Sequence, residues 1–175
     1  KPPAPASTSR PDGVRLRGGF LVEGGGVLVP SGPTGGAASL VIPTLHLGVQ
    51  INHILGVYYE NHPLFALLVG ASDITVGLMD LNTFIASATL LHTIELGGGG
   101  GFDVYAVAGC GGDATSACCG AGVEVLPGLH GKAAVHLGGW GGRDAHRSAF
   151  SLQAAFHASF DPSGGAILLP LFGFG

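Results

Sequence analysis

The feature that most constrains this chain is a regular alternation of apolar and polar residues along several long segments. Arg147–Phe160 shows it best: phenylalanine, leucine and alanine occupy one parity, while serine, glutamine and histidine recur on the other. A period of two residues is that of a β-strand, whose successive side chains point to opposite faces. We therefore expect a chain built of strands with two unlike faces.

The alternation in Val123–Leu137 continues through the dipeptide Pro127-Gly128 without a change of phase. Such a dipeptide is typical of a turn, and a proline inside a strand removes a ladder hydrogen bond unless it lies at a bulge. Because the phase is kept, we predict one long strand that is bent at this point.

Turn-forming segments separate the alternating ones and define about eight strands. Most are longer than the usual five or six residues of a soluble strand and exceed the nine to eleven needed to cross a bilayer at a tilt. Residues 1–13 are expected to form a flexible proline-rich leader, and 14–175 one domain. The predicted turns include Asn52-His53, Leu91–Ile94 and Asp161–Gly165, and the predicted strands are 14–29, 37–52, 54–69, 74–90, 95–109, 120–137, 147–160 and 165–175.

The composition excludes several classes of protein. Charged residues make up 10% of the chain and the mean hydropathy is +0.48, whereas a soluble domain usually carries about 25% charged residues. An α-helical membrane protein needs about 18 or more consecutive apolar residues, and the sequence has no such run. No basic patch combined with aromatic residues points to nucleic acid.

The charged residues decide which face of the strands meets which environment. They fall on the polar parity of the strands, in the leader or near turns; Asp80, on an apolar parity together with Asn82, is the exception and is expected at a strand end. A charge facing the bilayer midplane costs roughly 2–4 kcal/mol, which accounts for a charge-free face. We therefore predict an all-β fold, a closed antiparallel up-and-down transmembrane β-barrel of about eight strands with a polar interior.

The polar parity supplies the candidate residues of the lumen. An eight-stranded barrel is just wide enough for side chains to fill it, so we expect a hydrogen-bonded network, with no cofactor and no metal. The run Gly97–Gly101 lacks the Lys-Ser/Thr of a phosphate loop; it permits strand bending or makes room for bulky neighbours. The predicted network is Arg15, Arg17, Glu23, His46, Gln50, Tyr58, Glu60, His62, Asp103, Tyr105, Glu124, His130, Lys132, His136, Gln153 and His157.

Two further groups of residues invite a chemical interpretation. Cys110, Cys118 and Cys119 lie in one glycine-rich segment, where a disulfide from Cys110 to either of the others would close a short loop in an oxidising compartment. His157 and Ser159 are weak candidates for a catalytic pair, since a serine activated by a histidine can transfer acyl groups. Both fall on the polar parity, and no enzyme activity is predicted.

The chain resembles the small outer-membrane barrels of Gram-negative bacteria, in particular a group of glycine-rich, uncharacterised eight-stranded proteins. The resemblance rests on the segments Leu47–Asn52, Val57–Tyr59, Gly139–Gly141 and Phe172–Gly175, each of them short. It implies an exported protein of the bacterial outer membrane whose signal peptide has been removed. The implied partners are membrane lipids, lipopolysaccharide or detergent, and the barrel-insertion machinery, with no nucleic acid; a protein partner is not implied.

Four functions follow from this architecture. The leading one is a non-enzymatic barrel with a structural, anchoring or surface-interaction role. The alternatives are a narrow channel, a lipid-modifying enzyme that hydrolyses acyl chains of lipid A, and a soluble barrel that binds an apolar ligand.

Overall fold

The computed structural model describes residues 14–30, 36–41, 43–69, 73–91, 93–111, 118–137 and 149–175. No helix in these ranges is long and apolar enough to cross a membrane. The described residues form nine strands: β1 (Arg15–Gly26), β2 (Gly36–Val41), β3 (Thr44–Gln50), β4 (Leu55–Val69), β5 (Asp73–Leu90), β6 (Ile94–Gly111), β7 (Cys118–Leu137), β8 (Phe150–Phe160) and β9 (Ala166–Phe174).

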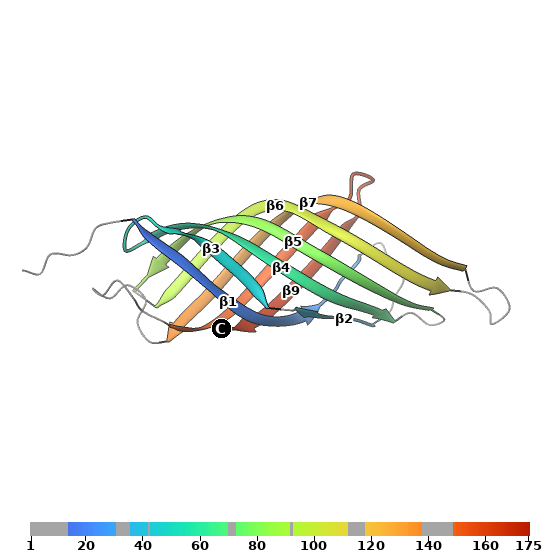
Figure 1. Ribbon diagram of the computed structural model, residues 1–175, viewed down its shortest axis with the longest axis horizontal. Helices are drawn as coiled ribbons and strands as arrows, with labels where there is room; N and C mark the ends of the chain where they lie inside the picture. Colours follow the sequence, from blue (N-terminus) through green and yellow to red (C-terminus); the bar gives the residue numbers. More distant parts are fainter. Residues whose placement is uncertain are drawn as a thin grey trace, which may run out of the picture.

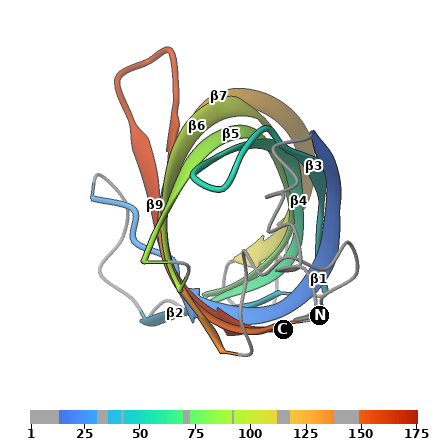
Figure 2. The same cartoon turned by 90° about the vertical axis from the view of Figure 1, so that its left-hand side faces the viewer.

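The strands close into a ring of antiparallel neighbours (Figure 1). Each strand from β3 to β9 pairs with the next, and β1 pairs with both β3 and β9, which closes the barrel. Seen along the barrel, the ribbons surround a central space (Figure 2). The predicted closed, up-and-down barrel is confirmed.

The second predicted strand, 37–52, is divided in the structure. β2 ends at Val41 and β3 begins at Thr44, with Pro43 between them. Both segments pair with β1 on one side and with β4 on the other, so together they act as one of eight barrel strands. The prediction of an unbroken strand was wrong because it passed over Pro43, which cannot donate a ladder hydrogen bond.

The long strand through Pro127 is confirmed. β7 keeps its register with β6 from Cys118 to Val135, and Pro127 lies opposite Phe102 without a break. Pairing with β8 begins only at Gly128, so Pro127 has a strand partner on one side alone. A proline is tolerated where a strand edge needs no donor.

Three predicted turns are present at the strand ends. Asn52 Oδ1 accepts the backbone N–H groups of Ile54 and Leu55 at 2.8 Å each. Leu91 has a left-handed φ of 49°. In the β8–β9 turn, the N–H of Ser163 donates to Asp161 Oδ1 at 2.7 Å, and this hydrogen bond lowers the pKa of the exposed Asp161 carboxyl.

The two faces of the barrel wall are distributed as predicted. Leu16 is 88% exposed and Phe20 71% exposed on the outside, whereas the intervening Arg17 is only 4% exposed and points inward. Other strands repeat this pattern. The outward apolar side chains include Leu45, Leu47, Leu78, Phe84, Phe102, Val125, Leu129, Phe156 and Phe172.

The lumen is not polar throughout, which corrects the prediction of a polar interior. One part is a packed apolar cluster. Leu64, Leu81 and Leu169 within it are at most 1% exposed. On β4 the inward residues change from Glu60 and His62 to Leu64 and Ala66, so the polar and apolar parts follow one another along the barrel. The cluster comprises Val27, Leu64, Ala66, Met79, Leu81, Tyr105, Leu126, Ala155, Leu169 and Leu171.

Asp80 and Asn82 do not lie at a strand end, as predicted, but in the middle of β5. They share the outward parity of Leu78 and Phe84. Their polar groups are satisfied by neighbours on β4: Asn61 Nδ2 donates to Asp80 Oδ1 and, at 3.2 Å, to Asn82 Oδ1. Asn82 Oδ1 also accepts the hydroxyl of Tyr59. This self-contained hydrogen bonding explains how polar groups persist on the outer face.

The glycine run Gly97–Gly101 lies where β6 approaches β5 closely. A β-carbon at Gly99 would lie 1.8 Å from the carbonyl oxygen of Phe84, and one at Gly101 equally close to that of Asn82. No other residue fits these two positions without moving the backbone. At these two positions the run thus allows the backbones of β5 and β6 to approach each other closely.

Candidate functional site

The candidate site is the polar part of the lumen, where side chains from β1, β4, β6, β7 and β8 meet. Twelve of the sixteen predicted network residues are buried there. They are drawn from strands far apart in the sequence because closure of the ring makes all inward faces converge. The buried members are Arg17, Glu23, Tyr58, Glu60, His62, Asp103, Tyr105, His130, Lys132, His136, Gln153 and His157.

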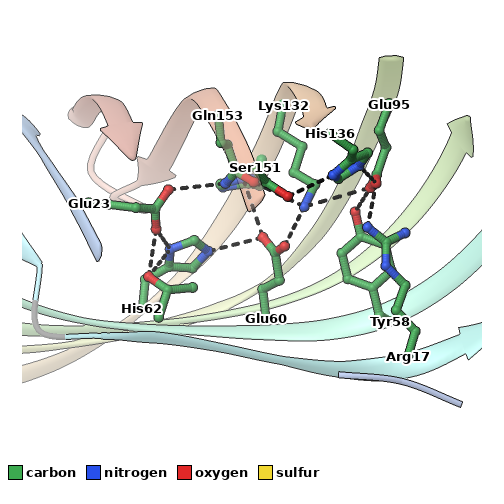
Figure 3. Close-up of polar contacts among 12 residues, drawn as sticks. Arg17, Glu23, Tyr58, Glu60, His62, Glu95, Lys132, His136, Ser151 and Gln153 are labelled. Carbon is green, nitrogen blue, oxygen red and sulfur yellow. Dashed lines mark hydrogen bonds and ion pairs between the residues drawn. The ribbon is translucent and has the colours of Figure 1, made fainter. Parts of the chain in front are cut away.

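The first centre of the network is Glu95, whose side chain is fully buried (Figure 3). It accepts hydrogen bonds from Arg17 and from the hydroxyl of Tyr58, and His136 Nε2 lies 2.8 Å from its Oε2. The Tyr58 ring also contacts the Arg17 guanidinium, with 4.7 Å between its centroid and Cζ. One carboxylate on β6 thus connects its own strand with β1, β4 and β7 across the lumen.

The second centre is formed by Glu60, His62 and Glu23 (Figure 3). Lys132 Nζ donates to Glu60 Oε1 at 2.5 Å. His62 Nδ1 lies 2.8 Å from Glu23 Oε2, and Gln153 Nε2 donates to Glu23 Oε1 at 3.0 Å. Buried charges in a lumen need such partners.

The third centre is Asp103, whose carboxylate contacts both weak catalytic candidates, His157 and Ser159. His157 Nε2 lies 2.8 Å from Asp103 Oδ2, and Ser159 Oγ donates to the same oxygen at 2.6 Å. Tyr105 Oη is 2.5 Å from Ser159 Oγ. A nucleophilic serine needs a base that accepts its proton, but here the serine hydroxyl is directed to the carboxylate. Since both side chains are also fully buried, the arrangement does not favour acyl transfer.

Four predicted network residues lie elsewhere than in the buried network. Glu124 is exposed, because β7 extends past the paired end of β8 at Gly128. Arg15, His46 and Gln50 are half-buried near the end of the barrel where the chain termini lie. Gln50 Oε1 is 3.5 Å from Arg17 Nη1.

Sequence reasoning missed Glu95 and Thr44 as members of the network. Glu95 begins the predicted strand 95–109, next to the turn at Leu91–Ile94, and the predicted network did not include it, but the structure buries it within β6. Its parity is the same as that of Asp103 and Tyr105, and this parity would have placed it inside. Thr44 Oγ1 donates to Glu23 Oε2 at 2.5 Å; it lies in the predicted strand 37–52 on the parity of His46 and Gln50, but the predicted network did not include it.

A cavity of about 270 Å³ adjoins the network on the side of the chain termini. Lys132 and Gln153 line it, so the cavity reaches the groups that contact Glu60 and Glu23. It lies beside Arg17–Leu21 of β1. This part of β1 precedes Val22–Gly25, the residues that pair with β9. Its other lining residues are Arg17, Gly18, Gly19, Phe20, Leu21, His46, His136, Ala149, Ser151 and Gly175.

Among the described residues, Glu60, His62 and His130 form a group that could hold a metal ion, since one ligand atom of each lies within 4.8 Å of those of the other two. For the three cysteines, the structure describes only the positions of the backbone. β6 and β7 place Cys110 opposite Cys119 and Gly111 opposite Cys118 in the backbone register. The three cysteine side chains lie outside the described residues, so the disulfide stays a prediction.

Comparison of the structure with solved proteins connects this barrel to known ones. Ail, the attachment invasion locus protein of Yersinia pestis, superimposes with a TM-score of 0.57 at 11% identity, over 93% of this chain and 95% of Ail. The chain has the fold of a small outer-membrane β-barrel. The predicted resemblance is confirmed at the level of the fold.

A second structure of Ail, in complex with the heparin analogue sucrose octasulfate, has a TM-score of 0.59 at 10% identity over 93% of this chain and 96% of Ail. The outer membrane protein OprG from Pseudomonas aeruginosa also matches, with a TM-score of 0.35 at 12% identity over 93% of this chain and 97% of OprG. No family model matches the sequence, and no curated protein matches it at the sequence level.

Proposed function

We propose that this protein resides in the bacterial outer membrane as a non-enzymatic barrel with a structural, anchoring or surface-interaction role. The observation that carries the proposal is the distribution of side chains, with apolar residues exposed around the wall and both polar and apolar residues packed inside it. A belt of exposed leucine, valine and phenylalanine is stable when lipid covers it. The implied partners are membrane lipids or lipopolysaccharide and, during biogenesis, the insertion machinery.

The β6–β7 hairpin supports the surface-interaction role. These are among the longest strands of the barrel. β5 pairs with β6 up to its last residue, Gly111, whereas β8 pairs with β7 only from Gly128 onward, so β7 extends beyond β8 at the end of the barrel opposite the C-terminus (Figure 1). Residues 121–125 are exposed on both faces, so this part of β7 stands clear of the lumen. With the termini on the periplasmic side, the hairpin faces the medium and offers a surface to an external partner. Ail, which has the same fold, was crystallised in complex with the heparin analogue sucrose octasulfate.

Gel mobility in SDS tests the membrane barrel. After extraction in mild detergent, the unboiled protein should migrate faster than the boiled protein, because a closed barrel resists unfolding by SDS. Failure to shift, together with solubility in buffer without detergent, would overturn the proposal and favour the soluble barrel with an apolar ligand.

Surface labelling tests location and orientation together. An epitope inserted between Gly111 and Cys118 should bind antibody on intact cells, whereas the same epitope inserted after His53 should bind only after permeabilisation. Labelling of both sites only after permeabilisation would contradict a surface-exposed hairpin.

A further inference from the structure

The lumen contains three buried acceptor atoms that face one another and have no hydrogen-bond partner in the part of the chain that the structure describes. They are Glu60 Oε2, His62 Nε2 and His130 Nε2. Glu60 Oε2 lies 3.3 Å from His62 Nε2 and 3.8 Å from His130 Nε2, and the three side chains are fully buried. Unpartnered buried polar atoms are rare and costly. Three such atoms that converge on one buried point have the arrangement of a set of ligands for a cation.

Outer hydrogen bonds fix how the two histidines present these atoms. Glu23 Oε2 lies 2.8 Å from His62 Nδ1 and can only accept, so the Nδ1 of His62 carries the proton. In a neutral imidazole the lone pair is then on Nε2, which faces Glu60. The lone pair is therefore oriented toward the centre of the group.

His130 is oriented by a longer chain of the same kind. Asp103 Oδ2 accepts from His157 Nε2 at 2.8 Å, which leaves the Nδ1 of His157 as an acceptor. His130 Nδ1 lies 3.3 Å from that atom and donates to it, so the lone pair of His130 is on Nε2. Carboxylates and other groups that hold the second ring nitrogen of a histidine are characteristic of metal sites.

The third ligand is oriented in the same way. Lys132 Nζ holds Glu60 Oε1 at 2.5 Å and leaves Oε2 directed to the histidines. All three ligands therefore have one atom held by an outer partner and one atom directed inward. Ligands of a tetrahedral zinc ion, at about 2.1 Å from the metal, lie about 3.4 Å apart, close to the two distances from Glu60 Oε2 to the histidines.

Charge in the lumen points in the same direction. The buried charged residues that the structure describes are the carboxylates Glu23, Glu60, Glu95 and Asp103 and the cations Arg17 and Lys132. Buried histidines beside these carboxylates can supply part of the balancing positive charge, and a cation in the lumen can supply the rest. A divalent ion at the centre of the group would supply two positive charges.

We propose that Glu60, His62 and His130 bind a divalent transition-metal ion of the zinc class in the lumen. Two imidazoles and one carboxylate suit Zn²⁺, Co²⁺ and Ni²⁺ better than Ca²⁺ or Mg²⁺. Three protein ligands leave the fourth position to water or a small anion. The cavity lined by Lys132 and Gln153 gives the ion a route toward the site.

The site would connect strands that are not neighbours. Glu60 and His62 are on β4 and His130 is on β7, with β5 and β6 between them in the ring. An ion held by both sides would cross-link the barrel through its lumen. This inference is independent of the cellular role proposed above, because metal binding is measured on the folded barrel in detergent.

Cobalt titration tests the site. The full-length barrel, purified in mild detergent and treated with a chelator, is titrated with Co²⁺ alone. We expect visible ligand-field absorption that saturates at about one ion per chain and is displaced by Zn²⁺. The variants H62A, H130A and E60Q should bind at least tenfold more weakly, since even the loss of an outer partner costs about 10–100-fold in affinity.

A matched control and an outer variant sharpen the result. H53A removes an exposed histidine in the β3–β4 turn and should bind cobalt as the unchanged protein does, whereas E23Q should weaken binding by about 10–100-fold. Each variant is first checked for the heat-dependent gel shift, so a failure to fold is seen separately. If one of the ligand variants does not fold, a second measurement replaces its titration. Zn²⁺ should then raise the temperature at which the unchanged barrel unfolds and should not do so for E23Q.

Each possible result of the cobalt titration either supports the metal site or overturns it. Saturable cobalt binding that the ligand variants remove supports the site. No saturable absorption in the unchanged, folded barrel would overturn it and indicate that a proton on His62, shared with Glu60, balances the charge. Binding that H62A and H130A leave unchanged would overturn it as well.

Discussion

At the scale of single residues, Gly128 shows how tightly the lumen is filled. A β-carbon there would lie 2.2 Å from Asp103 Oδ2 and 2.7 Å from His157 Nε2. Gly131, three residues further along β7, faces outward, and a β-carbon there would have no atom within 4 Å. The two glycines share one strand and differ only in the face they occupy.

The exchange G128A should therefore destabilise the barrel, whereas G131A should not. The added methyl group separates Asp103 from His157, and overpacking of this kind typically costs about 1–3 kcal/mol. The midpoint of urea unfolding, followed by the heat-dependent gel shift, measures the difference. Equal midpoints for the two variants would show that the Asp103–His157 contact adds nothing to stability.

Glu95 gives a second comparison at this scale. In E95Q a neutral amide replaces the carboxylate that contacts Arg17, Tyr58 and His136. Loss of one charge from a buried network costs about 3–5 kcal/mol. The exposed Glu124 provides the control, and E124Q should change the unfolding midpoint little. A small effect of E95Q would mean that the network relaxes around the amide.

At the scale of elements, β4 and β5 carry a polar patch on the face that lipid covers. Asn61 and Asn82 are directly opposed in the register, and Pro63 faces Asp80. The groups satisfy one another across the strand pair, which is how a half-exposed aspartate remains in an apolar wall. The patch depends on both strands, since neither one alone supplies donors for its acceptors.

Replacing Asn61 by alanine should weaken this pair of strands. Asp80 Oδ1 would lose its amide donor, whereas Asn82 Oδ1 would lose one of two donors and keep the hydroxyl of Tyr59; an acceptor left unsatisfied away from water costs about 1–3 kcal/mol. V57A is the control. Val57 lies on the same face of β4 and is 43% exposed, so V57A also removes side-chain surface from the outer face. In detergent, the hydrogen-exchange rates of the β4 and β5 amides should increase in N61A but not in V57A. Unchanged rates in N61A would indicate that water, rather than Asn61, satisfies the acceptors of the patch.

At the scale of the whole molecule, the filled lumen predicts poor conduction. The polar network closes one part of the interior, and the apolar cluster around Leu64, Leu81 and Leu169 closes another. Reconstitution into planar bilayers should therefore give no stable unit conductance steps, with a larger porin as the positive control. Reproducible steps would contradict a closed lumen and favour the narrow channel.

Much of this architecture could be predicted from local patterns. The parity of Arg17, Glu60 and His157 placed them inside before any pairing was known, because the two-residue period is a property of the strand itself. Glu95 was left out of the predicted network because it lies next to a turn, and the break at Pro43 was missed, since strand ends depend on which neighbours continue the ladder. Glu124 was misplaced for the same reason: β7 is longer than its partner β8.

The sequence alone determined the two faces of each strand, the number of strands needed to close a ring and the environment that each face requires. Only the tertiary structure decided which inward residues meet. Register across β4 to β9 is set by turns and packing over the whole ring, so no local pattern could predict that His130 approaches Glu60 and His62, or that leucines replace polar residues in part of the lumen. The faces follow from covalent geometry, whereas the juxtapositions follow from closure of the barrel.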